Sequence, residues 1–121
     1  MLRFFLKSKI HHATVTEVDP HYEGSIGIDQ ALLESADILP SEKVDIYNIT
    51  NGARFSTYAI PLQPLSGKIS LNGAAARLCL PGDLIIIASY ALLSEAEFQK
   101  HTPKVILLDA KNCKLSEKLA F

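Results

Sequence analysis

Several polar residues lie two positions apart in segments that alternate like strands, so their side chains would share one face of each strand. Lys9 and His11 form one such pair, and Arg54, Ser56 and Tyr58 form a second set. A guanidinium binds a carboxylate with two hydrogen bonds, and an ammonium adds a second positive charge. Together these residue types suit a small anionic substrate, although each one taken singly is more often a solvated surface residue.

The segment 21–26, His-Tyr-Glu-Gly-Ser-Ile, joins a strand-like run to a helical one and places a glycine before a serine. On its own the Gly24-Ser25 pair is typical of a turn, because glycine reaches backbone angles that other residues avoid and serine hydrogen-bonds its own backbone. A Ser-His-Asp hydrolase is not favoured, since Ser25 lacks the flanking glycines of a nucleophile elbow. The dipeptide needs support from the rest of the chain before it indicates chemistry.

Residues 72–76, Asn-Gly-Ala-Ala-Ala, follow a strand-like segment and can open a helical turn. The backbone N–H groups at the start of such a turn could face an anion. The same residues also fit an ordinary turn, so both interpretations stay open at this point.

Composition limits the class of protein. The chain has 121 residues, of which 48% are hydrophobic, and a formal net charge of −1, which predicts one domain with a buried core. Its 12 basic residues are scattered along the chain, so nucleic acid is not expected as a partner. Cys79 and Cys113 lack the spacing of a metal site and are expected to be reduced thiols of a cytoplasmic protein without a bound metal.

The same sequence predicts no membrane segment. Residues 1–12 carry basic side chains at positions 3, 7 and 9 and offer no small-residue cleavage site, so a signal peptide is not expected. The longest apolar run, residues 84–93, is about half the length of a membrane-spanning helix. We therefore interpret it as a buried strand.

The elements that must position the polar residues are mostly short strands. Asn51-Gly52 between two alternating runs is a strong signal for a hairpin with a type I′ turn. Asp29 can cap a short helix, and Ser94 and Glu97 match a capping box at the start of another. Strand-like patterns cover the ranges 2–6, 12–18, 44–50, 53–60, 66–73, 83–90 and 104–109, and helical ones begin at residues 30, 74 and 95.

Six or seven short strands with two or three small helices predict a compact, mostly-β barrel. A doubly wound α/β sheet is not expected, because helices do not separate every pair of strands. The polar remainder of the chain from about Lys111 is expected to fray.

Three motifs in this order and spacing resemble the bacterial aspartate 1-decarboxylase family: KIHHATVTEVDPHYEGSIGID at 9–29, NGARFSTYAI at 51–60 and SLNGAAAR at 70–77. The resemblance covers roughly residues 1–110. It implies a double-psi β-barrel and a homotetramer with active sites between neighbouring subunits. Two positions depart from it: His12 stands where the family often has arginine, and the segment from Lys111 matches no family motif.

The resemblance also gives the Gly24-Ser25 pair a chemical role. In this family the Ser25 hydroxyl attacks the Gly24 carbonyl, and the chain splits into residues 1–24, the β chain, and residues 25–121, the α chain. Ser25 then becomes a pyruvoyl group, which forms a Schiff base with the substrate amine and takes the place of pyridoxal phosphate. Glycine at position 24 would leave the carbonyl free of a Cβ atom. The implied reaction converts L-aspartate to β-alanine and CO2 for pantothenate and coenzyme A synthesis.

The resemblance assigns roles to individual residues as well. Tyr58 is the expected proton donor after CO2 leaves, and Thr57 is expected to assist cleavage and to touch the substrate. The full set expected to bind substrate is Lys9, His11, Arg54, Thr57, Asn72, Gly73, Ala74 and Ala75.

Two other interpretations stay open from the sequence. The chain could be a pyruvoyl decarboxylase for another small amino acid, or a non-catalytic small β-barrel that serves as an interaction module with Gly24-Ser25 as a plain turn. The sequence also leaves open whether cleavage is spontaneous or helped by an activating protein.

Overall fold

Two long strands support the rest of the molecule. They are β1 (Leu2–Thr14) and β7 (Leu84–Ser94), which pair in an antiparallel manner. Ile85 and Ile87 of β7 are fully buried, while Leu84 and Tyr90 are exposed. This alternation of β-branched and exposed residues is what a strand with one face on the core requires.

The structure, a computed structural model, describes residues 1–119. The shorter strands are β2 (Glu17–Asp19), β3 (Ser25–Asp29), β4 (Lys43–Asn48), β5 (Arg54–Leu62), β6 (Ile69–Asn72), β8 (Lys104–Leu108) and β9 (Lys114–Leu119). The helices are α1 (Gln30–Ser35), α2 (Glu95–Gln99) and the 3₁₀ helix η1 (Gly73–Leu78).

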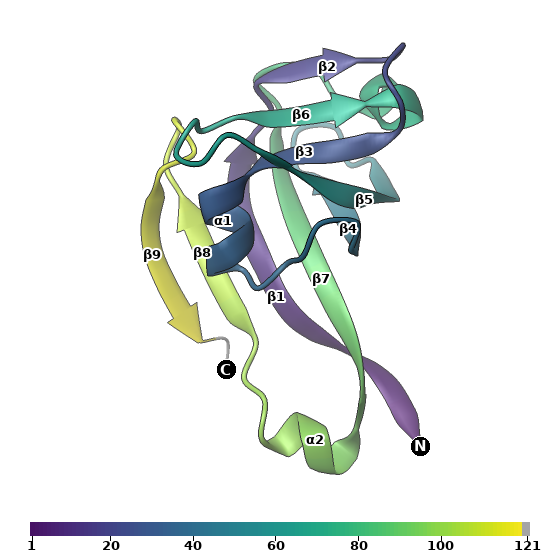
Figure 1. Ribbon diagram of the computed structural model, residues 1–121, viewed down its shortest axis with the longest axis vertical. Coiled ribbons are helices and arrows are strands. Elements are labelled where there is room, and N and C mark those ends of the chain that lie inside the picture. The colour runs from purple at the N-terminus through teal and green to yellow at the C-terminus, as the bar shows by residue number, and fades with distance from the viewer. Residues whose placement is uncertain (120–121) are drawn as a thin grey trace.

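All strands join one sheet in the order β2-β6-β3-β5-β4-β7-β1-β8-β9. The pairs β2/β6, β3/β5 and β1/β8 are parallel, and the other neighbours are antiparallel. Figure 1 shows that β2, β6 and β3 lie across the upper end of the β1–β7 pair, whereas α2 and the N-terminus lie at its lower end. The core contains the fully buried side chains of Ile10, Ile26, Ile28, Leu33, Ile46, Ile69, Leu71, Ile85, Ile87 and Ile106.

The mostly-β prediction is confirmed, and so are the two predicted helix caps, while the helix expected from residue 74 is the 3₁₀ helix η1, which begins at Gly73. The Asp29 carboxylate accepts a hydrogen bond from the Ala31 N–H at 2.8 Å and caps α1. Ser94 and Glu97 form a complete capping box at α2, with each side chain bound to the other residue's backbone N–H. The strand count is nine rather than six or seven, because β3 and β9 lie outside every predicted strand range. From the sequence we interpret the segment of β3 as the approach to a helix, and the predicted strands 2–6 and 12–18 correspond to β1 and β2.

The prediction that the chain frays from Lys111 is wrong. Asn112 is buried, and its side chain accepts from the Thr14 N–H at 2.7 Å and donates to the Thr14 and Gly67 carbonyl oxygens at 2.8 Å each. These three bonds fix the turn after β8, and β9 then pairs with β8 along its length. The polar strand is held by backbone pairing and by its first turn rather than by burial, since its own side chains are exposed.

The Asn51-Gly52 hairpin is confirmed as a hairpin, but not with the predicted two-residue turn. Residues 49–53 form its loop, and Gly52 at φ 81° is the loop residue with positive φ, whereas a type I′ turn needs two. The Asn48 side chain accepts hydrogen bonds from the Thr50 and Asn51 N–H groups and so stabilises the wider loop.

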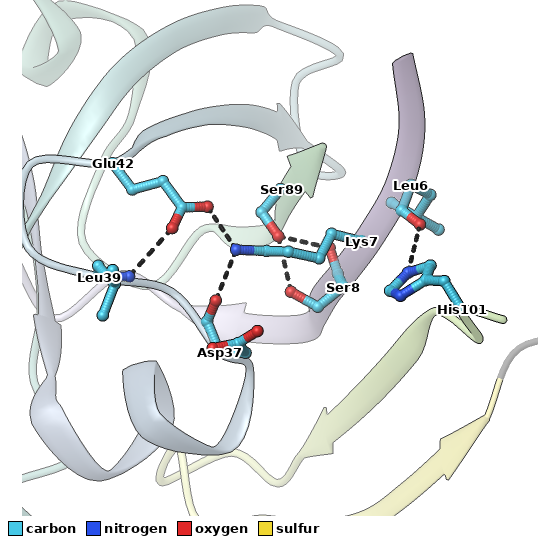
Figure 2. Close-up of polar contacts among 8 residues, drawn as sticks. All are labelled: Leu6, Lys7, Ser8, Asp37, Leu39, Glu42, Ser89 and His101. Carbon is cyan, nitrogen blue, oxygen red and sulfur yellow. Dashed lines mark hydrogen bonds and ion pairs between the residues drawn. The ribbon is translucent and has the colours of Figure 1, made fainter. Parts of the chain in front are cut away.

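Strand β1 contains two irregularities in its pairing with β7. One lies between Leu6 and Ser8, and the other lies between Ile10 and Ala13, where His12 has φ 62°. Lys7 lies at the first of them, and its ammonium contacts the Glu42 carboxylate at 2.7 Å and the Asp37 carbonyl oxygen at 2.6 Å (Figure 2). An extra residue in a strand turns the following side chains to the other face, so these two bulges decide where Lys9 and His11 point.

No helix among residues 1–119 has the length and apolar character needed to cross a membrane.

Candidate active site

The hydroxyl of Ser25 is buried and held by one neighbour. Ser25 is the first residue of β3 and pairs in register with Asn72, the last residue of β6. The Asn72 Nδ2 donates to Ser25 Oγ at 2.9 Å, and Asn72 Oδ1 accepts from the Ser70 hydroxyl at 3.0 Å. Because both ends of the Asn72 amide are engaged, the amide is fixed and Ser25 Oγ has a defined position.

Gly73 lies against the backbone of the Gly24-Ser25 segment. A Cβ atom at Gly73 would come within 2.7 Å of Gly24 Cα and 2.9 Å of Gly24 N, and Gly73 also has φ 66°. A Cβ atom at Gly24 would meet no atom within 4 Å. The sequence suggested that position 24 needs a glycine. In the structure the position where a side chain would collide is position 73.

A small cavity of about 200 Å³ opens beside Gly24. It is lined by Gly24, Phe55, Ser56, Thr57, Asn72, Ala74, Ala75 and Leu78. Thr57 enters from β5, and the two alanines enter from η1, which the 3₁₀ turn at Gly73 directs toward β3. The structure thus brings Thr57, Asn72 and the Gly-Ala-Ala segment together around the predicted cleavage point.

Arg54 and Tyr58 lie on the opposite face of β5 from Thr57. Arg54, Ser56 and Tyr58 are exposed, and Thr57 is half-buried, as the two-residue period of a strand predicts. The Arg54 guanidinium sits 3.9 Å from the centre of the Tyr47 ring, a cation–π contact. Within one chain, Arg54 and Tyr58 therefore do not line the cavity at Gly24.

Tyr47 is a residue that sequence reasoning missed. It pairs in register with Arg54 across the β4–β5 hairpin, and its hydroxyl contacts the Tyr90 hydroxyl at 2.7 Å. Burial, followed by the hydrogen bond with Tyr90, raises the pKa of Tyr47 to about 12, so its ring stays neutral under the guanidinium. The predicted two-residue turn would have placed Ile49 opposite Arg54, so the sequence held no signal for this pair, which the wider loop creates.

Lys9 and His11 line a third region, a pocket of about 600 Å³ over β1, β8 and β9. The His11 and His12 rings stack with centres 4.1 Å apart, and His11 Nδ1 is buried without a hydrogen-bond partner among the described residues. Burial lowers the pKa of His11, and electrostatic interaction with His12, Lys9 and Lys118 lowers it further. His11 is therefore an imidazole that is neutral near pH 7 and lies beside two lysines.

The predicted residues thus fall into three groups in the single chain. The first surrounds Gly24 and Ser25, the second is the Arg54–Tyr58 face of β5, and the third is the Lys9–His11 pocket. Residues 1–119 contain no group of three or more His, Cys, Asp or Glu side chains placed to hold a metal ion.

Comparison with known proteins gives this arrangement a family. The model of the aspartate decarboxylase family matches residues 1–114. A protein of Syntrophobacter fumaroxidans named aspartate 1-decarboxylase is 58% identical over 119 residues, which cover 98% of this chain and 96% of the relative. Proteins of the same name from Methylibium petroleiphilum and Thermoanaerobacter pseudethanolicus are 58% and 57% identical over 112 residues, or 93% of this chain and 93% and 96% of theirs. The resemblance seen in the three sequence motifs is confirmed, and the chain belongs to the aspartate decarboxylase family.

Proposed function

We propose that this protein decarboxylates L-aspartate to β-alanine and CO2 after cleaving its own chain between Gly24 and Ser25. The observation that carries the proposal is the hydrogen bond from Asn72 to the buried Ser25 hydroxyl, next to a backbone segment that Gly73 approaches closely. A plain turn needs neither feature. The family of the chain, with relatives named aspartate 1-decarboxylase, supplies the reaction.

The surroundings of Ser25 fit a pyruvoyl group made from that residue. Ser25 is 1% exposed, the Asn72 amide donates toward its side-chain oxygen, and small residues line the adjoining cavity. A pyruvoyl group supplies a carbonyl that takes the substrate amine and accepts the electron pair released when the carboxylate departs. Pyridoxal phosphate has no role in this proposal, and neither does a metal.

Cleavage uses residues that are already in contact. The Ser25 oxygen attacks the carbonyl carbon of Gly24, an ester bond replaces the amide bond, and the hydroxyl proton ends on the Ser25 nitrogen. Elimination then breaks the bond between the ester oxygen and Ser25 Cβ, which frees residues 1–24 as a carboxylate and leaves dehydroalanine at position 25. Water converts this residue to the pyruvoyl group, and its nitrogen leaves as ammonia. The neighbouring carbonyl needs no diffusional encounter, and Asn72 holds the attacking oxygen in place. Thr57, which lines the same cavity, is assigned as the donor that stabilises the negative oxygen of the attacked carbonyl.

Substrate binding uses the charged groups of the other two regions. Arg54 binds one carboxylate of aspartate with two hydrogen bonds, and its position is fixed by the Tyr47 ring below it. Lys9 attracts the anion, and the neutral imidazole of His11 orients it. Tyr58, 40% exposed on the same face as Arg54, returns a proton to the carbon that loses CO2.

The three regions can form one site only if subunits assemble, so we propose a homotetramer with active sites between neighbours. Lys9 and His11 lie in a different pocket from Gly24 within one chain, and a neighbouring subunit can bring such groups together. The projecting end of the β1–β7 pair also exposes large apolar side chains, with Phe4 77% and Leu92 51% exposed. Surface of this kind is typical of a face that a second copy covers.

The proposed setting is the cytoplasm, where β-alanine enters pantothenate and coenzyme A synthesis. Two free cysteines, Cys79 and Cys113, agree with a reducing compartment.

Intact-mass measurement with a decarboxylation assay tests the proposal. The purified chain should divide into residues 1–24 and 25–121, with no free amine at position 25, and should release CO2 from aspartate. Ser25→Ala should remain whole and inactive. A chain that remains a single 13.3 kDa species and releases no CO2 would support an interaction module instead. Competition between glutamate and aspartate separates the proposed reaction from that of a related decarboxylase.

A further inference from the structure

Strand β9 lies almost entirely outside the part of the chain that the family model matches. The match ends at residue 114, and β9 runs from Lys114 to Leu119. Its register places Lys118 opposite Val105 of β8, and Val105 is in turn opposite Lys9 of β1. Directly paired residues point to the same face of a sheet, so Lys118 and Lys9 share a face with one apolar residue between them.

The next row of the same face repeats this arrangement. His11 of β1 pairs with Leu107 of β8, which pairs with Ser116 of β9. Both rows line the 600 Å³ pocket described above, together with Leu6, His12 and Leu119. The pocket is therefore one face of the three-stranded β1–β8–β9 sheet, with an apolar floor and polar edges.

The charged side chains that line this pocket are both positive. They are Lys9 and Lys118, which lie beside the imidazoles of His11 and His12, and the described lining contains no aspartate or glutamate. Lys118 makes no ion pair among residues 1–119, whereas its strand neighbours Lys114 and Glu117 pair with each other at 3.2 Å. Two ammonium groups that stand on strands about 10 Å apart flank the apolar floor from both sides.

We propose that Lys118 is a specificity-determining residue of the substrate site, where it binds a second carboxylate and so selects small dicarboxylates over monocarboxylates. The inference rests on the proposed function, since it takes the Lys9–His11 pocket as the substrate-binding half of the site. Two cations can contact both ends of a dicarboxylate at once, and a monocarboxylate leaves one of them without a partner.

The register that places Lys118 in the pocket is set by the turn before β9, which hydrogen bonds hold in place. Asn112 ties this turn to Thr14 of β1 and to Gly67 through three hydrogen bonds. A competing explanation is that lysines on an edge strand simply prevent pairing with other chains. That explanation predicts no effect of Lys118 on the binding of a ligand.

Calorimetric binding of succinate to the purified, self-processed protein tests the proposal, with succinamate as the probe in which an amide replaces one carboxylate. Lys118→Gln should weaken succinate about two- to fivefold, as expected for one partly exposed ion pair, and should affect succinamate less. Lys114→Gln is the matched control, since it removes the same charge from the same strand at a residue outside the pocket, and it should leave both affinities unchanged. Lys118→Arg should retain most of the preference.

A second readout does not depend on any ligand. Because the charge of Lys118 lowers the pKa of His11, Lys118→Gln should raise the His11 pKa in an NMR titration, and Lys114→Gln should not. No binding of succinate by the wild type, equal effects of the two lysine variants, or equal loss for both probes would overturn the proposal. Cleavage and CO2 release from the unaltered chain are scored separately, so their failure would refute the proposed function instead.

Discussion

Gly73→Ala should stop or greatly slow cleavage of the chain at Gly24, although residue 73 is not expected to react. The added Cβ atom would lie 2.7 Å from Gly24 Cα, whereas ordinary contacts begin at 3.4 Å. The Gly24 backbone must then move by about 0.7 Å, the difference between these two distances. A misplacement near 1 Å in a reacting group can cost about 10²-fold in rate, so we expect a loss of about that size.

A second cost of Gly73→Ala is conformational, and a control variant isolates it. Residue 73 has φ 66°, where a side chain costs about 1–2 kcal/mol. Gly52 has φ 81°, and a Cβ atom there would meet nothing within 4 Å. Gly52→Ala therefore introduces the same unfavourable backbone conformation without contacting the Gly24 segment.

The assay follows the fraction of uncleaved chain by intact mass over time for both variants, with circular dichroism to show that each one folds. Gly52→Ala should lose about 1–2 kcal/mol of stability and cleave at the wild-type rate. Gly73→Ala should fold and remain mostly whole. If Gly73→Ala cleaves as fast as Gly52→Ala, the close approach of residue 73 does not position the scissile segment, and this reasoning is refuted.

Variants at four other residues test separate parts of the structure. Tyr58→Phe should still cleave its own chain but lose about 10²–10⁴-fold in turnover; near-normal kcat in fully processed protein would remove Tyr58 as the proton donor. Tyr47→Leu should raise KM for aspartate by removing the ring under Arg54, and Tyr47→Phe should largely preserve KM, whereas equal effects would exclude support by the ring. Asn112→Ala should destabilise the chain by about 2–4 kcal/mol, measured by chemical denaturation, because three hydrogen bonds are lost from a buried residue. The pKa of His11 in the folded state lies below its ordinary value of 6.5, so the unfolded state binds more protons. His11 should therefore lower the stability of the fold only as the pH falls below about 6.5. His11→Gln should reduce this loss of stability at low pH, and an unchanged pH profile of stability would contradict the lowered pKa.

Local patterns in the sequence were enough to predict the parts of the fold that depend on neighbouring residues. The shared face of Arg54, Ser56 and Tyr58 follows from the period of a strand, and the structure has it. The caps at Asp29 and Ser94 depend on residues within one turn, and both are present. The family motifs placed Ser25 and Asn72 in one site, but the hydrogen bond between them was not predicted.

The missed features depend on distant parts of the chain. One face of strand β9 carries Leu115 and Leu119 around Glu117, and its other face is polar, so its apolar pattern is weak. The strand exists because β8 offers an edge and Asn112 anchors the turn. The separation of Lys9 from Gly24 in a single chain depends on the whole sheet order. The charge that Lys118 adds beside Lys9 needs the register of three strands, which a linear pattern does not give.

The bulge at Lys7 makes β1 tolerant of substitution but sensitive to length. Replacing residue 7 would remove its contacts with Glu42 and Asp37 and leave every other side chain on its present face. Deleting it would restore regular pairing with β7. The side chains of Leu2–Leu6 would then move to the opposite faces of the sheet, while the residues from Ser8 onward keep theirs. Phe4, now exposed, would move to the opposite face while Lys9 and His11 stayed in place. Relatives that diverge freely in composition along this strand should therefore keep a constant number of residues between Phe4 and Lys9.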